Sequence, residues 1–285
     1  RGIDEKDSVK CYLPDQDITA PWWASRAEVW WKLCADQPWW MGGFVWTGFD
    51  YRGEPTPFQW PNINSHFGIM DVCGFPKNIY YYYQSWWSDQ DVIHISPHWN
   101  HKGMEDSLIK AWVNSNAEKV ELFLNKKSLG MKEMPLNGHL EWMVPYAPGE
   151  LVASGVKNGK KIITKVETTG EPIRVVLMVS KTNLKANDED VAIVNVSVLD
   201  SAGREVPDAL NLIKFSLFGN AKIIGVGNGD PSSHEADQCG VGKWQRQLFN
   251  GKCQVIFQAG TKPGKVILTA TSDRLKDGTA EFVSF

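Results

Sequence analysis

The sequence WMGGFVWTGFDYRGEP, residues 40–55, joins a short apolar run to a loop that carries aromatic and charged side chains. The glycine pair Gly42–Gly43 precedes Phe44–Trp46, and polar residues follow at once. A short apolar run bounded by such breakers is typical of a buried strand whose end opens onto a loop. The segment therefore predicts a strand over residues 42–47 that delivers side chains to the rim of a domain.

Helical patterns lie on both sides of this strand. Thr19 is a candidate N-cap, and Pro21 fits the first turn of a helix. Apolar residues then recur at helical spacing, namely Trp23, Ala27, Trp30, Trp31 and Cys34. We therefore expect a helix over residues 19–36 and, after a proline- and glycine-rich loop over 48–75, a second helix over 77–87. A loop of that length inside a compact domain usually carries function.

The hydrophobic period changes from about 3.6 to about 2 after residue 91. Apolar residues alternate at Ile109, Ala111 and Val113; Val120, Leu122 and Leu124; Leu140, Trp142 and Val144; Val194, Val196 and Val198; Ile213, Phe215 and Leu217; and Val266, Leu268 and Ala270. Asn158-Gly159 lies between two such runs and predicts a type I′ hairpin. Short strands separated by turn signals predict two β-sandwiches, joined by a linker at residues 168–172.

The segment 40–55 resembles the eighth strand and the following loop of the catalytic barrel in glycoside hydrolase family 2, the family of β-galactosidases and β-glucuronidases. A complete (β/α)8 barrel takes about 250 residues, so the resemblance implies only the last part of a barrel here. The helix before the strand would correspond to the seventh barrel helix.

Later motifs resemble the domains that follow the barrel in bacterial members of the family. His98–Asn100, Val120–Asn125 and Val144–Leu151 resemble its immunoglobulin-like domain, and Gly225–Pro231 resembles a loop of a later accessory domain. The implied fold class is mainly β, with a partial (β/α)8-barrel remnant over 1–90, an immunoglobulin-like sandwich over 91–170 and a second over 171–285. Lys126 replaces the glycine usual in a turn of the first sandwich, so the geometry of that turn is in question.

The resemblance also implies a reaction. Retaining glycosidases of this kind use one carboxylate as the nucleophile and a second carboxyl group as acid/base. In the family both are glutamates, at the ends of the fourth and seventh strands, so no catalytic residue is expected in this chain. We expect the parent protein to be a β-galactosidase (EC 3.2.1.23) that releases terminal β-D-galactosyl residues with retention and without a cofactor. The chain alone should be inactive.

The candidate substrate-binding residues lie in the loop after the strand. By resemblance, Trp46 is the tryptophan on which the sugar stacks, although a core aromatic would fit the same pattern. Asp50 and Glu54 could bind sugar hydroxyls or form salt bridges within the loop. His66 could line the pocket or hydrogen-bond inside the loop, and Asp71 is expected to be structural.

One position bears on the choice of sugar. The β-glucuronidase branch of the family has an Asn-x-Lys pair that binds the sugar carboxylate, whereas the matching residues here are Ser65-His66-Phe67. Phenylalanine cannot pair with a carboxylate, so a neutral β-galactoside is the expected substrate. The alternatives are another family 2 specificity, such as β-glucuronidase or β-mannosidase, and a non-enzymatic adhesin or carbohydrate-binding module that uses Trp99 or Trp112.

Composition argues against several other classes of protein. With a net charge of −3, the chain lacks the basic excess of a nucleic-acid binder, and no apolar run is long enough to span a membrane. The five cysteines are expected to be free thiols, although Cys239 and Cys253 could meet across a hairpin. A periplasmic or secreted location is more typical of this architecture than a cytoplasmic one. The barrel remnant over 1–90 is expected either to pack on the first sandwich or to pair with a second copy of the chain and form a homo-oligomer.

Two further patterns resemble binding sites only in part. His94, His98 and His101 lie close together, but their context fits a loop entering a sandwich better than a metal site, so no metal is expected. The glycines of residues 225–230 do not sit between a strand and a helix, which argues against a phosphate-binding loop.

Overall fold

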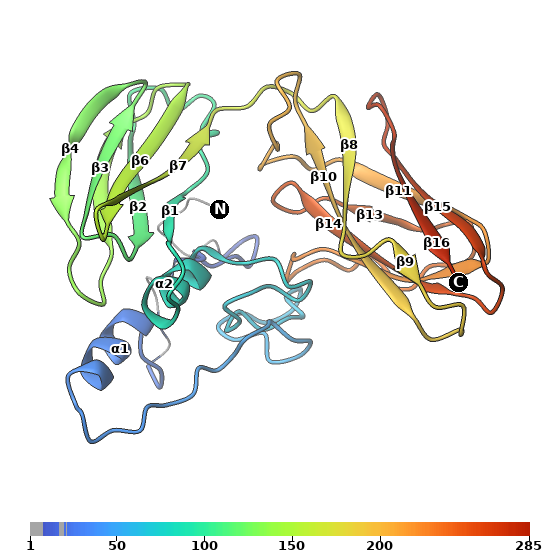
Figure 1. Cartoon of the computed structure of the whole chain (residues 1–285), viewed down its shortest axis with the longest axis horizontal. Coiled ribbons are helices and arrows are strands. Elements are labelled where there is room, and N and C mark those ends of the chain that lie inside the picture. Colours follow the sequence, from blue (N-terminus) through green and yellow to red (C-terminus); the bar gives the residue numbers. More distant parts are fainter. Residues whose placement is uncertain (1–7, 17–19, 21) are drawn as a thin grey trace. The chain divides into compact units, whose positions relative to one another are not determined.

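The structure, a computed structural model, describes residues 8–16, 20 and 22–285. It divides into two compact units, Arg1–Thr168 and Thr169–Phe285 (Figure 1). The fold is mainly β, as the alternation of apolar residues predicts. No helix lies between Ser107 and Phe285, a stretch that is described in full.

The first unit contains two helices in its described part, followed by seven strands. These are α1 (Ala27–Ala35), α2 (Asn78–Trp87), β1 (Ile93–Ser96), β2 (Leu108–Ser115), β3 (Lys119–Leu124), β4 (Lys127–Glu133), β5 (Leu140–Pro145), β6 (Glu150–Lys157) and β7 (Lys160–Glu167). The strands form two antiparallel sheets, in the orders β1-β2-β5 and β4-β3-β6-β7. Alternate residues of both sheets fill the core between them, with Val113, Val120 and Val144 fully buried.

Helix α2 packs on the outer face of the β1-β2-β5 sheet. The side-chain amide of Asn114, on β2, donates to the carbonyl of Asn78 at 3.3 Å. The ring of His94, on β1, stacks on Tyr81 with 3.5 Å between centroids. This cover explains why β2 is buried at almost every residue rather than at every second one. The described part of residues 1–90, which we call the N-terminal segment, therefore packs on the first sandwich through α2, one of the two outcomes expected for it.

The loop between β4 and β5, residues 134–139, contacts both helices of the N-terminal segment. The indole of Trp31 donates to the side-chain oxygen of Asn137 at 3.1 Å, and the hydroxyl of Tyr82 donates to the carbonyl of Asn137 at 2.8 Å. Trp86 donates to the carbonyl of Gly138 at 3.0 Å. Oxygen acceptors of Asn137 and Gly138 at this junction thus find aromatic N–H and O–H donors.

The predicted strand over residues 42–47 is wrong. The structure assigns no strand there, and Phe44 is fully exposed. A barrel strand needs a hydrogen-bonded neighbour on each side. Here only Thr47 has partners of this kind, since its N–H donates to Phe67 at 3.1 Å and its carbonyl accepts from Ile69 at 3.0 Å.

The predicted first helix is too long. Helix α1 begins at Ala27, whereas the expected helix covered residues 19–36. Thr19 and Pro21 lie outside the described residues. Trp22 is almost fully exposed, so the residues just before α1 lack the apolar packing that stabilises most helices in proteins. The second helix, α2, begins one residue later than predicted and ends where predicted, at Trp87.

Two hairpins of the first sandwich have the same backbone geometry. Asn158-Gly159 connects β6 to β7 with φ angles of 49° and 76°, which confirms the predicted type I′ turn. Asn125-Lys126 connects β3 to β4 with φ angles of 48° and 69°. The lysine therefore occupies a left-handed conformation, and the turn keeps its shape without glycine.

The second unit is a larger sandwich. Its strands are β8 (Arg174–Val179), β9 (Asn183–Leu184), β10 (Val191–Leu199), β11 (Leu212–Phe218), β12 (Ala221–Gly227), β13 (Gln245–Gln247), β14 (Lys252–Ala259), β15 (Gly264–Thr271) and β16 (Gly278–Ser284). They form sheets in the orders β12-β14-β10-β8 and β13-β11-β15-β16-β9 (Figure 1). Phe257 and Phe282 meet edge to face in the core between the sheets, with 4.8 Å between centroids.

Neither helix of the described residues is long and apolar enough to cross a membrane. None of the five cysteines forms a disulfide, and Cys11, Cys34 and Cys253 are buried. The possible bridge between Cys239 and Cys253 does not form.

Candidate functional site

The candidate site is the irregular segment from Phe44 to Lys77, which we call the rim segment. Its centre is Asp50, a buried carboxylate that forms an ion pair with Lys77 at 2.7 Å. The same carboxylate accepts from the N–H of Gly68 at 2.8 Å and from the Ser65 hydroxyl at 3.4 Å. Burial alone raises the pKa of Asp50, and Lys77 acts in the opposite direction. Asp50 therefore connects the start of the rim segment to Lys77 at its end. Both carboxylate oxygens of Asp50 already have partners within the segment.

Gly68 allows two stretches of backbone in the rim segment to approach each other closely. A Cβ at this position would lie 2.2 Å from the backbone nitrogen of Asp50 and 2.3 Å from the carbonyl oxygen of Met70. Asp50 donates its N–H to that carbonyl at 3.0 Å, beside a bridge between Phe49 and Met70. Only glycine leaves room for this approach.

Two more predicted residues have structural partners. Asp71 accepts from the N–H groups of Cys73 and Phe75 at 2.8 and 3.0 Å, and its burial raises its pKa to about 6. His66 lies within the loop, with its Nε2 3.0 Å from the side-chain nitrogen of Asn62. Burial, together with the charge of Lys77, lowers the pKa of His66 to about 4. The same nitrogen of Asn62 donates to the carbonyls of Pro55 and Asn64, so His66 lies within a hydrogen-bonded part of the loop.

Trp46 differs from these residues because its ring is open to solvent. Its side chain is 72% exposed, and its indole Nε1 donates to the hydroxyl oxygen of Tyr51 at 3.1 Å. Tyr51 in turn donates to the carboxylate of Glu54. Trp46 thus presents an aromatic face at the surface of a segment whose interior is held by hydrogen bonds and one ion pair.

The histidines considered as metal ligands have other contacts. His94 is 2.8 Å from the side-chain oxygen of Asn78, and burial lowers its pKa to about 4. His98 and His101 stack on each other with 5.3 Å between centroids. The described residues contain no group of three or more His, Cys, Asp or Glu side chains arranged to hold a metal ion.

The tryptophans considered for a carbohydrate-binding module are buried. Trp99 is fully enclosed, and its Nε1 donates to the carbonyl of Ala147 at 3.0 Å. Trp112 stacks on His139 with 4.0 Å between centroids. Neither residue presents a ring face on which a sugar could stack.

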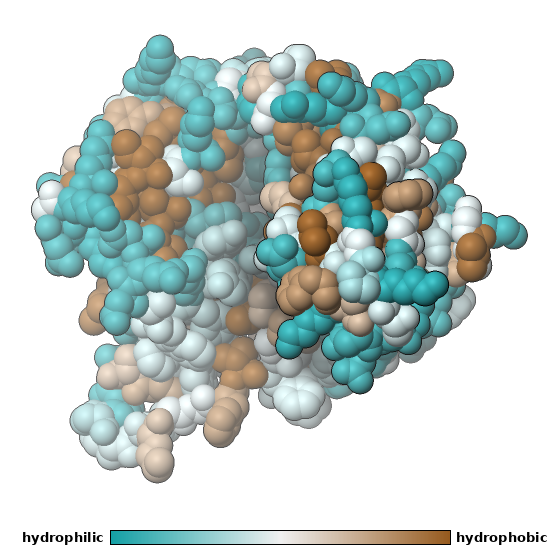
Figure 2. Space-filling model, turned by 45° about the vertical axis from the view of Figure 1, so that its right-hand side comes forward, coloured by the Kyte–Doolittle hydropathy of each residue, from teal (hydrophilic) through white to brown (hydrophobic). Residues whose placement is uncertain are grey.

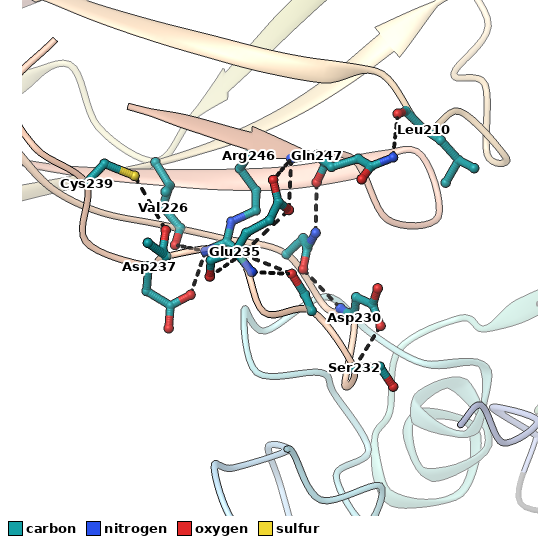
Figure 3. Close-up of polar contacts among 12 residues, drawn as sticks. Leu210, Val226, Asp230, Ser232, Glu235, Asp237, Cys239, Arg246 and Gln247 are labelled. Atoms are coloured by element: carbon teal, nitrogen blue, oxygen red, sulfur yellow. Dashed lines mark hydrogen bonds and ion pairs between the residues drawn. The ribbon is translucent and has the colours of Figure 1, made fainter. Parts of the chain in front are cut away.

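A long loop of the second unit, residues 228–244, is organised around a buried arginine. The guanidinium of Arg246 is 1% exposed and forms an ion pair with Asp237 at 2.6 Å (Figure 3). It also donates to the carbonyls of Val226 and Glu235 and to the hydroxyl of Ser233. A buried charge with several hydrogen-bond partners fixes the backbone around it.

The glycine-rich start of the same loop satisfies its own backbone. Asp230 donates its N–H to the side-chain oxygen of Asn228 at 3.2 Å, and Ser232 donates to the carboxylate of Asp230 at 2.9 Å (Figure 3). These N–H groups are therefore not directed toward an anion. The loop does not have the arrangement of a phosphate-binding site.

Comparison with known proteins identifies the family. A domain of unknown function (DUF4982) matches residues 106–163, and glycoside hydrolase family 2 C-terminal domain 5 matches residues 175–281. Beta-galactosidase BoGH2A of Bacteroides ovatus is 43% identical over 269 residues, covering 93% of this chain and 30% of that protein. The chain is a glycoside hydrolase family 2 sequence and matches the C-terminal region of that family. A putative beta-glucuronidase of Formosa agariphila is 37% identical, over 83% of this chain and 23% of that protein.

Solved family 2 structures have the same fold. A beta-glycosidase from Bacteroides vulgatus gives a TM-score of 0.84 at 34% identity, over 90% of this chain and 33% of that one. A glycosyl hydrolase family 2 member from Bacteroides cellulosilyticus gives 0.83 at 29% identity, over 92% of this chain and 38% of that one. The chain spans between 23% and 38% of the length of these four relatives.

Sequence reasoning missed two residues of the rim segment in this family 2 chain. Lys77 was assigned only to the start of a helix, although it provides the charge that compensates Asp50. Tyr51 has no role in the sequence-based prediction, although it connects Trp46 to Glu54. A signal for the second was present, because Tyr51 and Glu54 stand three residues apart around Gly53 in a turn.

Proposed function

We propose that the rim segment forms one side of the sugar-binding subsite in a retaining β-galactosidase (EC 3.2.1.23). The observation that carries this proposal is the exposed ring of Trp46 on a segment with a hydrogen-bonded interior. An aromatic face of this kind stacks on the apolar face of a pyranose. Asp50 and His66 would then support the loop that carries Trp46 rather than contact the sugar, because both are engaged in contacts within that loop.

The charge of the rim segment supports a neutral sugar. Ser65 is fully buried beneath Tyr51, and Phe67 packs edge-on against Trp23 with 5.7 Å between centroids. Lys77 is paired with Asp50. Of the positions that match the Asn-x-Lys pair of β-glucuronidases, none carries a cation that could bind a sugar carboxylate. The relative named a putative beta-glucuronidase keeps a uronidase as the second candidate.

A non-enzymatic carbohydrate-binding module has less support. It would require an exposed aromatic platform on a sandwich, but Trp99 and Trp112 are both buried. A glycan-array screen of residues 91–285, which contain Trp99 and Trp112, would favour such a module only if it gave strong and specific binding.

The first test compares the chain with the complete protein. Double displacement needs a nucleophilic carboxylate and a second carboxyl group about 5–5.5 Å away, and we propose that both come from residues outside this chain. Purified 1–285 should not hydrolyse a chromogenic β-D-galactoside, whereas the complete protein should. Trp46→Ala should lower kcat/KM of the complete protein by about tenfold or more, as expected for loss of a stacking contact. Turnover by 1–285 that disappears with Trp46→Ala would overturn the proposal.

The second test concerns the choice of sugar. In the complete protein, Phe67→Lys should raise kcat/KM for a β-D-glucuronide relative to the β-D-galactoside, because it adds a cation where uronidases have one. Phe67→Met is the matched control, since it keeps an apolar side chain and adds no charge. Wild-type preference for the glucuronide would replace β-galactosidase by the second candidate.

A further inference from the structure

An exposed tryptophan is normally free to change rotamer, but Trp46 is tethered at one edge. Its indole Nε1 donates to the hydroxyl oxygen of Tyr51 at 3.1 Å. The two rings meet edge to face, with 6.1 Å between centroids and 80° between planes. Because the contact uses the edge of the indole, both hydrogen bond and exposed ring face can exist together.

The direction of this hydrogen-bond chain is fixed by chemistry. An indole N–H can only donate, and a carboxylate can only accept. Tyr51 therefore accepts from Trp46 and donates its single proton to Glu54, as the structure shows. The hydrogen bond to Glu54 raises the pKa of Tyr51, which keeps the phenol protonated. The chain of hydrogen bonds from Trp46 therefore needs both the hydroxyl of Tyr51 and the carboxylate of Glu54.

The backbone of Tyr51 is itself held in place. Its N–H donates to the hydroxyl of Ser65 at 3.1 Å, and its carbonyl accepts from the N–H of Ser65 at 2.8 Å. Ser65 connects this pair to the buried Asp50. Gly53 and Glu54 both have positive φ angles, 86° and 47°, where the chain turns back toward Tyr51. Tyr51 thus connects the exposed indole to the buried centre of the rim segment.

We propose that Tyr51 and Glu54 are positioning residues that hold the indole of Trp46 in the orientation used to stack on a sugar. This proposal rests on the proposed function for its role in hydrolysis. It differs from a direct contact between Tyr51 and the substrate, because Tyr51 would act only through Trp46. An ordered ring loses less conformational freedom when the sugar binds, so the tether favours binding.

The tether can be tested in the chain itself, without any activity. Fluorine NMR of 1–285 labelled with 5-fluorotryptophan gives a Trp46 resonance, assigned by its absence from Trp46→Phe. Tyr51→Phe and Glu54→Ala should shift and broaden this resonance, whereas Glu54→Gln, which keeps an acceptor, should change it less. Tyr80→Phe removes a hydroxyl from helix α2 and serves as the matched control. An unchanged Trp46 resonance in Tyr51→Phe would overturn the proposal.

The role in binding is tested in the complete protein. Tyr51→Phe should raise KM for the β-D-galactoside by about three- to tenfold with a smaller change in kcat, in the range expected for one lost hydrogen bond. Glu54→Gln should keep KM closer to the wild-type value than Glu54→Ala does. The double variant Trp46→Ala/Tyr51→Phe should be no worse than Trp46→Ala, because two residues that act through one ring do not add.

The outcomes separate the two proposals. If the effects of Trp46→Ala and Tyr51→Phe multiply, Tyr51 contacts the substrate directly and the positioning role is wrong. If KM does not change in Tyr51→Phe while Trp46→Ala still reduces activity, the tether has no role in binding. If the complete protein does not hydrolyse β-galactosides, or is indifferent to Trp46→Ala, the proposed function fails. The NMR measurement then still decides whether Tyr51 and Glu54 hold the indole.

Discussion

Two turns of the first sandwich require the same left-handed backbone conformation, one at a lysine and the other at a glycine. Lys126 and Gly159 occupy equivalent positions in type I′ hairpins, with φ angles of 69° and 76°. An L-residue in this left-handed region costs roughly 1–2 kcal/mol, whereas glycine adopts it freely but loses more entropy on folding. Asn125 compensates in part, because its side chain accepts from the N–H of Glu150 and donates to the carbonyl of Pro148.

Replacing Lys126 with glycine should stabilise the first unit by about 0.5–1 kcal/mol, the difference between these two costs. The reciprocal variant Gly159→Lys should destabilise it by a similar amount, since a Cβ there meets nothing within 4 Å and only the backbone term changes. Urea unfolding followed by tryptophan fluorescence measures both. Thirteen of the fourteen tryptophans lie at or before residue 142, so the signal reports on the first unit. A Lys126→Gly variant less stable than wild type would contradict this account.

At the scale of elements, the loop 134–139 joins the sandwich to helix α1 through a histidine, His139, that contacts two glutamates. His139 contacts Glu28 of α1 at 2.5 Å and Glu141 of β5 at 3.1 Å, and its ring stacks on Trp112 of β2. Glu28 also pairs with Lys32, one turn later in the helix. Burial alone would lower the pKa of His139, but the hydrogen bonds and charges of the two glutamates raise it above 6.5.

This contact should make stability depend on pH. The contribution of His139 is complete below its unfolded pKa near 6.5 and is lost as pH rises through the higher folded value. Burial alone would raise the pKa of Glu28, but its hydrogen bonds with His139 and Lys32 lower it below 4.5. The contribution of Glu28 is therefore lost as pH falls through that lower value. His139→Gln should cost about 1 kcal/mol at a pH between 4.5 and 6.5 and less at pH 9.

Urea midpoints of wild type and His139→Gln across this range would check the prediction. His234→Gln, which removes an exposed histidine of the second unit, is the control for loss of one imidazole. A wild-type advantage that grows above pH 7 would show that the neutral ring, and not its ion pairs, stabilises the junction.

At the scale of the whole molecule, the two units differ in self-sufficiency. The second unit buries its own core between two sheets and coincides with a family domain over residues 175–281. The first sandwich lacks this independence, because helix α2 packs on the outer face of β2, where Asn114 donates to the carbonyl of Asn78. We expect residues 169–285 to fold cooperatively when expressed alone. Residues 91–168 should be much less stable than the same strands within 1–285.

Circular dichroism and urea unfolding of the two fragments would test this difference. The fragment 169–285 should give a single sharp transition at the midpoint that this unit has in 1–285. A fragment 91–168 as stable as the first unit would show that α2 contributes little, and that the boundary near residue 90 divides two independent domains.

The N-terminal segment also exposes a large aromatic surface. Exposed aromatic side chains of this segment include Trp22, Trp39, Trp40, Phe44, Trp46 and Trp60. In Figure 2 the lower end of the first unit is mostly white to brown, with little of the teal of the sandwich above it. Surfaces of this kind drive association in the absence of a partner. We expect 1–285 to associate with a concentration dependence that 169–285 lacks, as measured by light scattering during gel filtration. A monodisperse monomer of 1–285 at high concentration would contradict this expectation.

Local patterns in the sequence determined most of the two sandwiches. The apolar positions of β2, β3, β5, β10 and β15 alternate because successive side chains of a strand point to opposite faces, and this information lies within a few residues. The turn at Asn158-Gly159 followed from the φ angles that its residues allow. The motif around Trp46 is also local, and this short pattern of side chains indicated the family.

Tertiary contacts decided the rest. Residues 42–47 have the composition of a strand but lack neighbouring strands, and a strand exists only through hydrogen bonds to a partner. Trp112 has the position of an outward-facing residue but is buried, because α2 and His139 cover that face of β2. The roles of Asp50 and Tyr51 depend on Lys77 and on Trp46 and Glu54, which only the folded loop brings together. Sequence patterns specify local geometry, whereas burial and the pairing of charges depend on residues that are distant along the chain.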